Sequence, residues 1–380
     1  MYYENKKDSF LKYVIFFMLI IIIFLLWIVV LNMSQNREMY GEYYAEKMIN
    51  ENEENNSKDV DDKESVNTEE NKKNIIYEAS KSIVGISKIK QNDSSIFIED
   101  SETKLGLASG VVISKKGYIL TNAHVVGNKY SICYVTVDSG EKYSANVVWI
   151  DENIDLAIIK ISAYDLKEIT LGDSDNISLA EDVYAIGNPI GFEFQRTITK
   201  GIISGINRTI KVEEDKDVSY MEDLIQTDAC INEGNSGGAL INEKGELIGI
   251  NTIKLSDADG IGFAVPVNLI KPILEKLEKE SRFEEAYLGI SGFDKEVIPY
   301  LDSNIDILSG IYVAKVNIDG PVYLTRIKEG DIILEIDNLK INKMNELKKY
   351  IYSKNPGDTV KLKVKRAALE FDIEVILGKK

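Results

Sequence analysis

The chain has 380 residues, more than one ordinary domain needs, and 44% of them are apolar, as in a globular protein. Its formal net charge of -17 argues against nucleic acid as a partner, because phosphate backbones bind surfaces rich in lysine and arginine. The two cysteines, Cys133 and Cys230, are too few for a disulfide framework. We expect both to be small buried apolar side chains, and a single bridge between them stays open.

An uncharged apolar stretch covers residues 13–31 and follows three lysines, Lys6, Lys7 and Lys12. As a helix these residues span about 28 Å, close to the roughly 30 Å of a bilayer's hydrocarbon core. Since positive residues stay on the cytoplasmic side, the sequence predicts a cytoplasmic tail at 1–12, a transmembrane helix at 13–31 and all later residues outside the cytoplasm. A cleaved signal peptide is the alternative, but the stretch is longer than such peptides usually have and no cleavage pattern follows it.

Residues 32–74 are rich in glutamate, asparagine, lysine and aspartate, with twelve acidic against six basic side chains from Ser34 to Asn74. Few of these residues can enter a core, so the composition predicts a flexible acidic linker. A helix continuing from the membrane to about Asn50 is an alternative for the first part. The acidic residues could also form a binding tail.

Short β-rich stretches recur through residues 75–281, separated by turn signals such as Lys115-Lys116-Gly117. Many short strands at regular spacing predict a mainly β domain, a barrel or sandwich and most simply two small barrels. Apolar residues at helical spacing predict a helix over 267–280 at the end of this domain. The expected strands are 83–87, 110–113, 118–120, 132–137, 146–150, 156–161, 182–186, 201–206, 247–253 and 262–265.

Residues 282–380 form a second domain in this interpretation, with mixed strands and helix. Expected strands cover 311–316, 332–336, 359–364 and 371–377, and a helix is expected over 344–353. Gly330-Asp331 and Pro356-Gly357-Asp358 mark turns between them.

The segment Gly234-Asn235-Ser236-Gly237-Gly238 places a serine between glycines, which allow a tight turn and a close approach to a substrate. A serine hydroxyl is a weak nucleophile at neutral pH and needs a base beside it. The backbone N–H groups of Gly234 and Ser236, with Asn235 between them, can hold an oxyanion. Ser236 is therefore a candidate nucleophile on a candidate oxyanion hole.

His124 is the only histidine in the chain and follows the expected strand at 118–120. Asp155 opens the apolar strand at 156–161, where a buried carboxylate needs a partner such as imidazole Nδ1–H. Asp151 and Asp173 lie in polar turns and are less well placed. Taken singly, His124 could be structural and Asp155 a turn residue, but together with Ser236 they predict a Ser-His-Asp triad.

These residues lie in stretches that resemble the HtrA/Deg family of trypsin-like serine proteases, in the form that has a membrane anchor and one PDZ domain. The resemblance implies a chymotrypsin-like double β-barrel, catalytic roles for His124, Asp155 and Ser236, and no metal, ATP or other cofactor. It also implies cleavage of unfolded or misassembled proteins and, in many members, a homotrimer. The matching stretches are 121–126, 155–157, 187–191, 200–205, 226–229, 234–240 and 260–266.

The resemblance also indicates which loops border the catalytic residues. It implies that the loop from Cys230 to Glu233 adjusts the oxyanion hole between inactive and active states. A pocket for the residue before the scissile bond would be lined by Ile231, Ile250, Asn251, Thr252 and Ile253. Apolar walls there favour medium-sized aliphatic side chains, because an unpaired charge would be desolvated. Glu233 departs from the family pattern.

The last domain resembles a PDZ domain, in which free N–H groups beside a strand edge bind a peptide's C-terminus. Tyr287, Leu288, Gly289 and Ile290 resemble the carboxylate-binding loop, and residues 330–337 resemble the central strand. The alternative is that Leu288 and Ile290 merely pack in a core. The stretch from Asp294 to Ser309 departs from compact PDZ domains.

The sequence thus predicts a membrane-anchored serine endopeptidase that degrades misfolded or damaged proteins outside the cytoplasm and captures peptide C-termini. Its expected partners are unfolded polypeptides, the lipid bilayer and two further copies of itself, without nucleic acid. A catalytically silent, membrane-tethered chaperone or adaptor is the alternative. An esterase is disfavoured because no strand–Gly-x-Ser-x-Gly–helix elbow is present.

Overall fold

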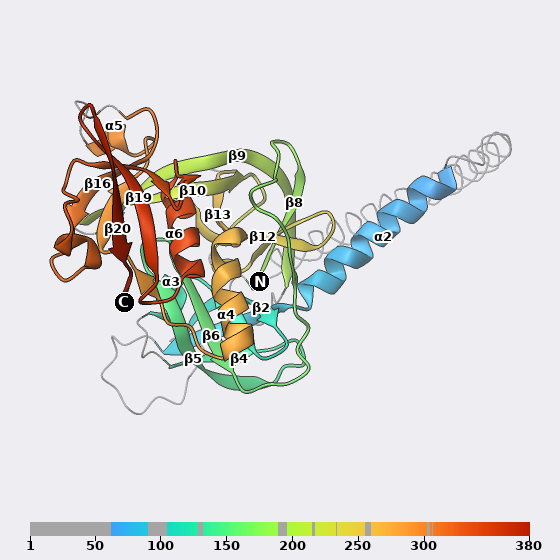
Figure 1. Ribbon diagram of the computed structural model, residues 1–380. Helices are drawn as coiled ribbons and strands as arrows, with labels where there is room; N and C mark the ends of the chain where they lie inside the picture. The colour runs from blue at the N-terminus through green and yellow to red at the C-terminus, as the bar shows by residue number, and fades with distance from the viewer. Residues whose placement is uncertain are drawn as a thin grey trace, which may run out of the picture. The chain divides into compact units, whose positions relative to one another are not determined.

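The computed structural model of the chain describes residues 62–89, 105–127, 132–188, 196–214, 217–232, 234–254, 260–301, 305 and 307–380 (Figure 1). The predicted cytoplasmic tail, the predicted transmembrane helix at 13–31 and residues 32–61 of the predicted linker lie outside these ranges. Within the described ranges, the structure contains no helix whose length and apolar character would suit a membrane span.

Helix α2 (Asp62–Ser80) includes residues that the sequence assigned to the flexible linker. Ile76 and Ala79 near its end are buried, and both belong to the main hydrophobic core. Ser80 Oγ closes the end of the helix by donating to the Tyr77 carbonyl over 2.7 Å. The structure thus places residues 62–74 of the predicted linker in this helix, whose end is held by packing of Ile76 and Ala79.

A closed barrel comprises β1 (Ile83–Ile89), β2 (Leu105–Ser114), β3 (Tyr118–Thr121), β4 (Ile132–Thr136), β5 (Lys142–Asp151) and β6 (Leu156–Ile161). The strands follow the order β1-β2-β3-β6-β5-β4, and pairing of β1 with β4 closes the ring. Alternating aliphatic side chains such as Ile86, Ile119, Val135 and Ile159 fill its interior. The short helix α3 (Ala123–Val126) follows β3.

The second half of this domain is a sheet of antiparallel strands with one short parallel addition. It comprises β7 (Thr170–Leu171), β8 (Asp182–Gly187), β9 (Thr197–Glu214), β10 (Asp217–Thr227), β11 (Ala239–Asn242), β12 (Glu246–Lys254) and β13 (Gly262–Pro266). The order is β11-β8-β9-β10-β13-β12-β7, and the additional β11–β12 pairing closes a second ring. Val183, Ile203 and Leu240 lie in its interior cluster.

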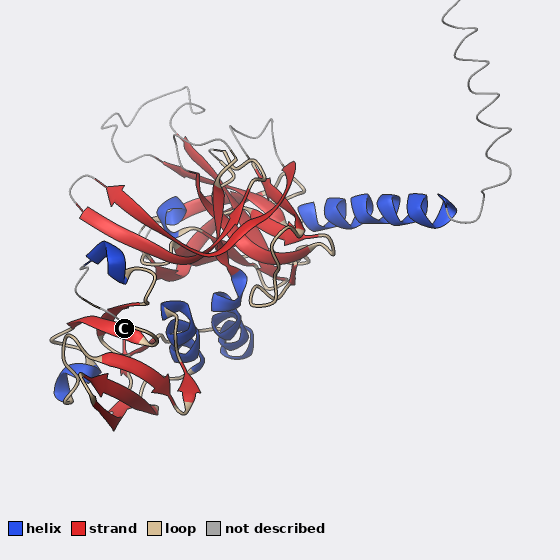
Figure 2. Cartoon of the chain, turned by 90° about the horizontal axis from the view of Figure 1, so that it is seen from above, coloured by secondary structure: helices blue, strands red, loops and turns tan. Residues whose placement is uncertain are grey.

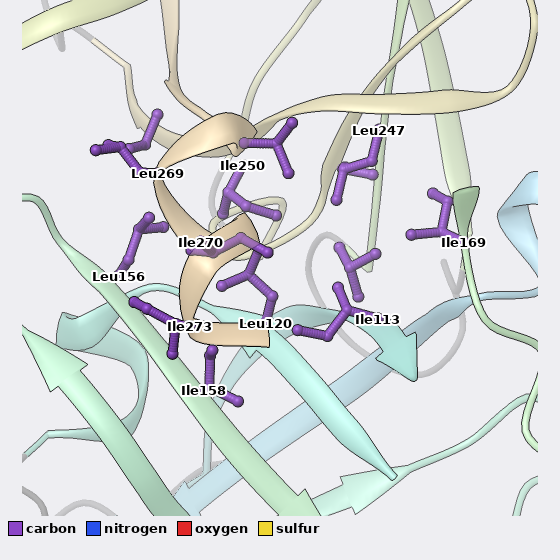
Figure 3. Packing of buried hydrophobic residues seen from close by; sticks show 14 of the residues in the cluster. Ile113, Leu120, Leu156, Ile158, Ile169, Leu247, Ile250, Leu269, Ile270 and Ile273 are labelled. Carbon is purple, nitrogen blue, oxygen red and sulfur yellow. The ribbon is translucent and has the colours of Figure 1, made fainter. Parts of the chain in front are cut away.

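The largest core joins both barrels to the helix that follows them. The 3-10 turn η4 (Val267–Ile270) leads into α4 (Lys271–Glu280), as predicted for 267–280. Figure 3 shows Ile270 and Ile273 packed against Leu120 and Ile158 of the first barrel and near Ile250 of the second. Burial of each such side chain stabilises the folded chain by roughly 1.5–3 kcal/mol. The helix therefore fixes the two barrels, and so the two halves of the site, against each other.

The C-terminal domain, residues 282–380, contains a sheet in the order β15-β16-β17-β19-β20 and a short β14–β21 pair (Figure 2). Helix α6 (Met344–Ser353) matches its predicted bounds and lies beside α4. Strand β15 stands at the edge of the sheet, with its other side paired to β16. The remaining elements are β14 (Ala286–Tyr287), β15 (Ile290–Phe293), α5 (Ile298–Leu301), β16 (Ile311–Val316), η5 (Pro321–Leu324), β17 (Ile332–Ile336), β18 (Leu339–Lys340), β19 (Thr359–Arg366), β20 (Leu369–Ile376) and β21 (Gly378–Lys379).

Cys133 and Cys230 do not form a disulfide bond in the part of the chain that the structure describes. Cys133 lies in the interior of the first barrel, as expected. Cys230 is exposed, so the expected burial is wrong for this residue. The reason is its place: Cys230 follows β10 in the loop before Ser236, where the chain has left the sheet.

Candidate active site

The turn that carries Ser236 uses glycine where another residue would clash. Gly234 and Gly237 have φ angles of 91° and 79°, a region that other L-residues rarely adopt. A Cβ atom on Gly237 would lie 2.2 Å from the Ser109 carbonyl oxygen and from Thr121 Oγ1. The glycines of the motif are therefore required by the fold of the turn.

Ser109, on strand β2 of the first barrel, holds this turn from behind. Its hydroxyl donates to the Gly234 carbonyl over 2.6 Å, and its backbone N–H donates to the Ser236 carbonyl over 2.9 Å. Thr121 Oγ1 in turn donates to the Ser109 carbonyl over 2.7 Å. The first barrel thereby positions the serine that the second barrel carries.

Some backbone N–H groups of the turn donate to nearby carbonyl groups, and others do not. Asn235, Gly237 and Gly238 donate to the carbonyls of Asn232, Asn251 and Asn235 over 2.8–3.0 Å. The N–H groups of Gly234 and Ser236, the predicted oxyanion donors, have no acceptor among the described residues. Glu233 lies outside the described ranges. The side chain of Asn235 is buried, and its amide donates to the Cys230 carbonyl over 3.4 Å.

His124 and Asp155 lie together, as the sequence predicts. His124 Nδ1 is 2.9 Å from both carboxylate oxygens of Asp155, and the His124 backbone N–H donates to Oδ1 over 3.0 Å. Half of the His124 side chain is exposed, at 52%, against 13% for Asp155. The imidazole therefore has one nitrogen held by a sheltered carboxylate and a ring that can meet a substrate. Which nitrogen carries the proton is set by that carboxylate, which accepts from Nδ1–H.

Asp155 has an unusual backbone conformation, with φ of 52°. Asn122, which is fully buried, donates its amide N–H to the Asp155 carbonyl over 2.9 Å. A residue in this region costs of order 1–3 kcal/mol and persists only where its surroundings hold it. The aspartate is thus fixed both through its side chain and through its backbone.

Thr252 on β12 connects the serine to the aspartate. Ser236 Oγ donates to the Thr252 carbonyl over 3.0 Å, and Thr252 Oγ1 donates to Asp155 Oδ2 over 2.5 Å. The structure therefore brings Ser236, Asp155 and His124 into one hydrogen-bonded network that spans both barrels. Sequence reasoning gave Thr252 only a pocket role, because no local pattern links it to a residue so far away in the chain.

The other predicted pocket residues occupy different surroundings. Ile231 is buried and packs against Gly262, where a Cβ atom would lie 2.7 Å from Ile231 Cδ1. Ile250 belongs to the core between the barrels, and Asn251 is fully buried with its amide donating to the Ala239 carbonyl over 2.9 Å. These two residues support the serine turn. The backbone of Ile253 lies on β12, and its side chain lies outside the described parts.

The predicted carboxylate-binding loop joins β14 to β15. Gly289 has φ of 87°, and a Cβ atom there would meet Gly320 Cα at 2.6 Å. Leu288 is buried in the core of the C-terminal domain and Ile290 packs against that core. Tyr287 OH accepts a hydrogen bond from the Asn317 amide. The loop is closely packed, and β15 continues from it along the sheet edge.

A cleft of about 1010 Å³ extends from this edge to the candidate catalytic residues His124 and Asp155. His124, Asp155 and Thr252 line one part, and β15 residues Ile290 to Phe293 line another. Met344, Asn345 and Lys348 of helix α6 complete the wall on the C-terminal domain. A polypeptide lying along β15 would therefore share one cleft with His124 and Asp155.

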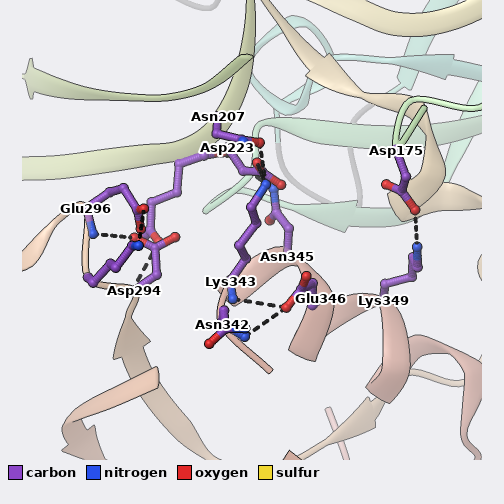
Figure 4. A network of polar contacts seen from close by, with 12 residues as sticks. Asp175, Asn207, Asp223, Asp294, Glu296, Asn342, Lys343, Asn345, Glu346 and Lys349 are labelled. Atoms are coloured by element: carbon purple, nitrogen blue, oxygen red, sulfur yellow. Dashed lines mark hydrogen bonds and ion pairs between the residues drawn. The ribbon is translucent and has the colours of Figure 1, made fainter. Parts of the chain in front are cut away.

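Polar contacts join the protease domain to the C-terminal domain, and of their residues Glu222 lines this cleft (Figure 4). Lys343 Nζ lies 2.7 Å from Asp223 Oδ1, and Lys349 Nζ lies 2.7 Å from Asp175 Oδ2. The Asp294 backbone N–H approaches Glu222 Oε2 at 3.5 Å. Burial raises the pKa of both Glu222 and Asp294. The Asp294 charge raises the pKa of Glu222 further, whereas a hydrogen bond with Glu222 lowers the pKa of Asp294 and the Glu296 charge raises it.

Comparison with known proteins gives consistent matches over most of the chain. Residues 108–250 match a trypsin-like peptidase domain and residues 248–377 match a PDZ domain. Serine protease Do-like HtrA of Bacillus subtilis is 36% identical over 326 residues, which are 80% of this chain and 72% of that protein. Serine protease Do-like HtrB of the same organism is 34% identical over 310 residues, covering 77% and 67%. The solved structure of the HtrA-type protease AlgW with a tripeptide is 31% identical, with a TM-score of 0.59 over 81% of this chain and 97% of that one.

Proposed function

Because this chain belongs to the HtrA family of trypsin-like serine proteases, we propose that it degrades misfolded or damaged proteins outside the cytoplasm while anchored in the cell membrane. It is a serine endopeptidase with a PDZ domain. Hydrolysis of a peptide bond needs a nucleophile, a base for its proton and donors for the oxyanion. The chain supplies all three from its own residues.

In the proposed reaction, the Ser236 side chain turns from the Thr252 carbonyl toward His124 and attacks the substrate carbonyl carbon. His124 takes the hydroxyl proton, and Asp155 stabilises the imidazolium that forms. The N–H groups of Gly234 and Ser236 bind the oxyanion; one such donor is worth roughly 10²–10³ in rate. The imidazolium returns its proton to the leaving amine as the C–N bond breaks. Water, deprotonated by the same imidazole, then cleaves the acyl-enzyme ester.

The observation that carries the proposal is the His124–Asp155 contact of 2.9 Å, joined through Thr252 to Ser236 Oγ. A half-exposed imidazole against a sheltered carboxylate can accept a proton from an incoming hydroxyl group. The same cleft leads to β15, which supports capture of peptide C-termini as an added strand on the PDZ sheet.

The proposed anchoring rests on the uncharged stretch at 13–31 and the lysines before it. In this arrangement the N-terminus is cytoplasmic, and the protease and PDZ domains face outward across the linker. A homotrimer is proposed from the family resemblance. Unfolded polypeptides are the proposed substrates.

Replacing Ser236 by alanine tests the catalytic assignment. With an unfolded protein as substrate, turnover is expected to fall by at least about 10³-fold, as for removal of a nucleophile from other serine proteases. A fluorophosphonate probe is expected to label the unchanged chain at Ser236 and to leave Ser236→Ala unlabelled. Ser178→Ala, at an exposed turn, is the matched control and keeps full activity.

The alternative of a silent chaperone or adaptor makes the opposite prediction. Such a protein would take up no probe at Ser236, and its Ser236→Ala variant would match the unchanged chain in every assay. Persistence of cleavage in Ser236→Ala would overturn the assignment of the nucleophile.

A further inference from the structure

Asp151, the last residue of β5, is a buried carboxylate with four donors around it. Its side chain is 3% exposed, and a buried charge is costly unless it is paired. Oδ1 accepts from the backbone N–H of Asn153 over 3.0 Å and from the Asn153 amide over 3.1 Å. Oδ2 accepts from Lys348 Nζ over 3.0 Å and from the Tyr352 hydroxyl. One oxygen therefore binds its own turn and the other binds helix α6 of the PDZ domain.

The charges near Asp151 keep it ionised. Burial by itself would raise its pKa, but Lys348 and Lys380 hold the pKa well below the usual range for a carboxyl group. Lys380 Nζ also lies 2.8 Å from Glu285 Oε1, and Trp149 Nε1 donates to the other Glu285 oxygen over 3.2 Å. The four donors around Asp151 thus face a carboxylate over the whole pH range in which a serine protease works.

The turn that begins at Asp151 ends at the aspartate proposed for the triad. The Asp155 backbone N–H donates to the Glu152 carbonyl over 3.3 Å, and Ile154 between them is buried in the core. The Asp155 carboxylate holds His124 at the end of this turn. Because the turn is short and fixed at both ends, a displacement of Asp151 is transmitted to Asp155.

Helix α6 meets this turn with two residues one helical turn apart, Lys348 and Tyr352. Tyr352 is 3% exposed, and its ring lies edge-on to Trp149 at 5.7 Å and to Phe283 at 6.3 Å. Lys348 and Met344 line the cleft together with β15 residues Ile290 to Phe293. The helix that borders the proposed peptide groove is thus bonded to the turn that carries Asp155.

We infer that Asp151 is a positioning residue, through which helix α6 of the PDZ domain sets the orientation of the Asp155 carboxylate against His124. Asp151 itself touches no substrate and acts through the turn. The inference rests on the proposed catalytic roles of His124, Asp155 and Ser236. It adds that the bonds from Lys348 and Tyr352 to Asp151 couple the position of helix α6 to the orientation of Asp155.

Tyr352→Phe is the sharpest test, because it removes one donor to Asp151 and leaves the ring and every charge in place. The substrate is a peptide too short to reach β15, so that peptide capture does not enter. With the full chain, kcat is expected to fall roughly tenfold at unchanged KM, within the hundredfold that a 1 Å misplacement costs. Asp151→Asn is expected to lower kcat further.

A pH profile separates positioning from a general loss of folded protein. When Asp155 is displaced from His124, the imidazolium is less stabilised, so the acid limb of the kcat/KM profile is expected to move to lower pH in Tyr352→Phe. A purely structural role would lower the amplitude of the profile and leave the position of that limb unchanged, which would overturn the inference.

Two controls lie on or beside the same helix. Tyr350→Phe removes a tyrosine hydroxyl that donates to Asp337 over 2.7 Å within the PDZ domain, and it is expected to leave kcat unchanged. Lys343→Met breaks the ion pair with Asp223 and so weakens docking away from the Asp155 turn. If Lys343→Met lowers kcat as much as Tyr352→Phe does, docking in general is what counts and the Asp151 route is wrong.

Failure of the inference is distinguishable from failure of the proposed function. If Ser236→Ala is inactive but Tyr352→Phe and Asp151→Asn keep the unchanged kcat and pH profile, the triad stands and the Asp151 link falls. If Ser236→Ala remains active, the catalytic assignment itself is wrong, whatever the variants at Asp151 and Tyr352 show.

Discussion

Thr252 hydrogen-bonds to two of the three candidate triad residues, one from each barrel. Its carbonyl accepts from Ser236 Oγ, and its hydroxyl donates to Asp155 Oδ2. Its role depends on one hydroxyl group within a buried side chain, which is 3% exposed. A hydrogen bond to a charged group contributes about 1.5–3 kcal/mol, enough to decide how the carboxylate is oriented.

Thr252→Val therefore removes the donor while keeping the shape of the side chain. We expect kcat for a short peptide to fall by about 10- to 100-fold, the equivalent of that hydrogen bond, with KM little changed. Thr252→Ser keeps the hydroxyl and is expected to retain most of the activity. Full activity of Thr252→Val together with a loss in Thr252→Ser would show that the methyl group matters and the hydroxyl does not.

At the scale of elements, a bulge in β10 brings acidic side chains to the PDZ domain. The register with β9 shifts between Met221 and Leu224, and Asp223 has φ of 60°. Bulges re-aim side chains that an unbroken ladder would alternate. Here Asp223 meets Lys343, and Glu222 meets Asp294. The sequence analysis missed β10 as a strand, since its charged residues interrupt the apolar alternation.

Helix α4 is the element whose packing fixes both barrels, and Ile273 is its fully buried contact. Ile273→Ala is expected to destabilise the chain by about 2–5 kcal/mol through the lost burial and the cavity left behind. Urea unfolding followed by tryptophan fluorescence measures this change. Glu280→Ala, at an exposed position of the same helix, is the control and should stay within about 0.5 kcal/mol. A smaller effect of Ile273→Ala than of the control would contradict this role.

At the scale of the whole molecule, the protease and PDZ domains share a buried carboxyl pair. Burial, and then the neighbouring Asp294 carboxylate, raise the pKa of Glu222 from 4.5 to about 9. Lys348 opposes this shift, and Glu296 faces Asp294 from the other side, its backbone N–H donating over 3.1 Å. Near neutral pH, a protonated Glu222 can thus donate a hydrogen bond to the Asp294 carboxylate. This bond stabilises the interface between the two domains.

The raised pKa predicts the direction of a pH effect. The folded chain binds the Glu222 proton more tightly than the unfolded chain, so the stabilisation is complete below pH 4.5 and is lost as pH rises toward about 9. Glu222→Gln keeps a neutral donor at every pH, and its melting temperature should exceed that of the unchanged chain most at pH 9 and least at pH 5. Asp175→Asn, which removes a carboxylate at an exposed ion pair, should show no such pH trend. If the difference in melting temperature between Glu222→Gln and the unchanged chain is the same from pH 5 to pH 9, the predicted role of the Glu222 proton is wrong.

Local sequence patterns were sufficient to predict much of the architecture. The mainly β chain with a trypsin-like domain and a PDZ domain is confirmed by the matching families. Each expected strand lies within or overlaps an observed strand, and the expected helices at 267–280 and 344–353 are present, because alternation and helical spacing report which face is buried. Membrane anchoring at 13–31, the trimer and the outward location stay predictions.

The sequence by itself determined that the chain is a serine endopeptidase and predicted its triad. A glycine-flanked serine, a single histidine and an aspartate opening an apolar strand are local signals that depend on residue type and turn geometry. Only the tertiary structure decided that Thr252 links them, that Ile250 and Asn251 support the turn, and that Asp151 binds a PDZ helix. The reason is physical. Thr252 and Asp155 are 97 positions apart in the chain, and Lys348 and Asp151 are 197 positions apart. No local pattern encodes such a pairing, because it arises only when two barrels and a second domain pack together.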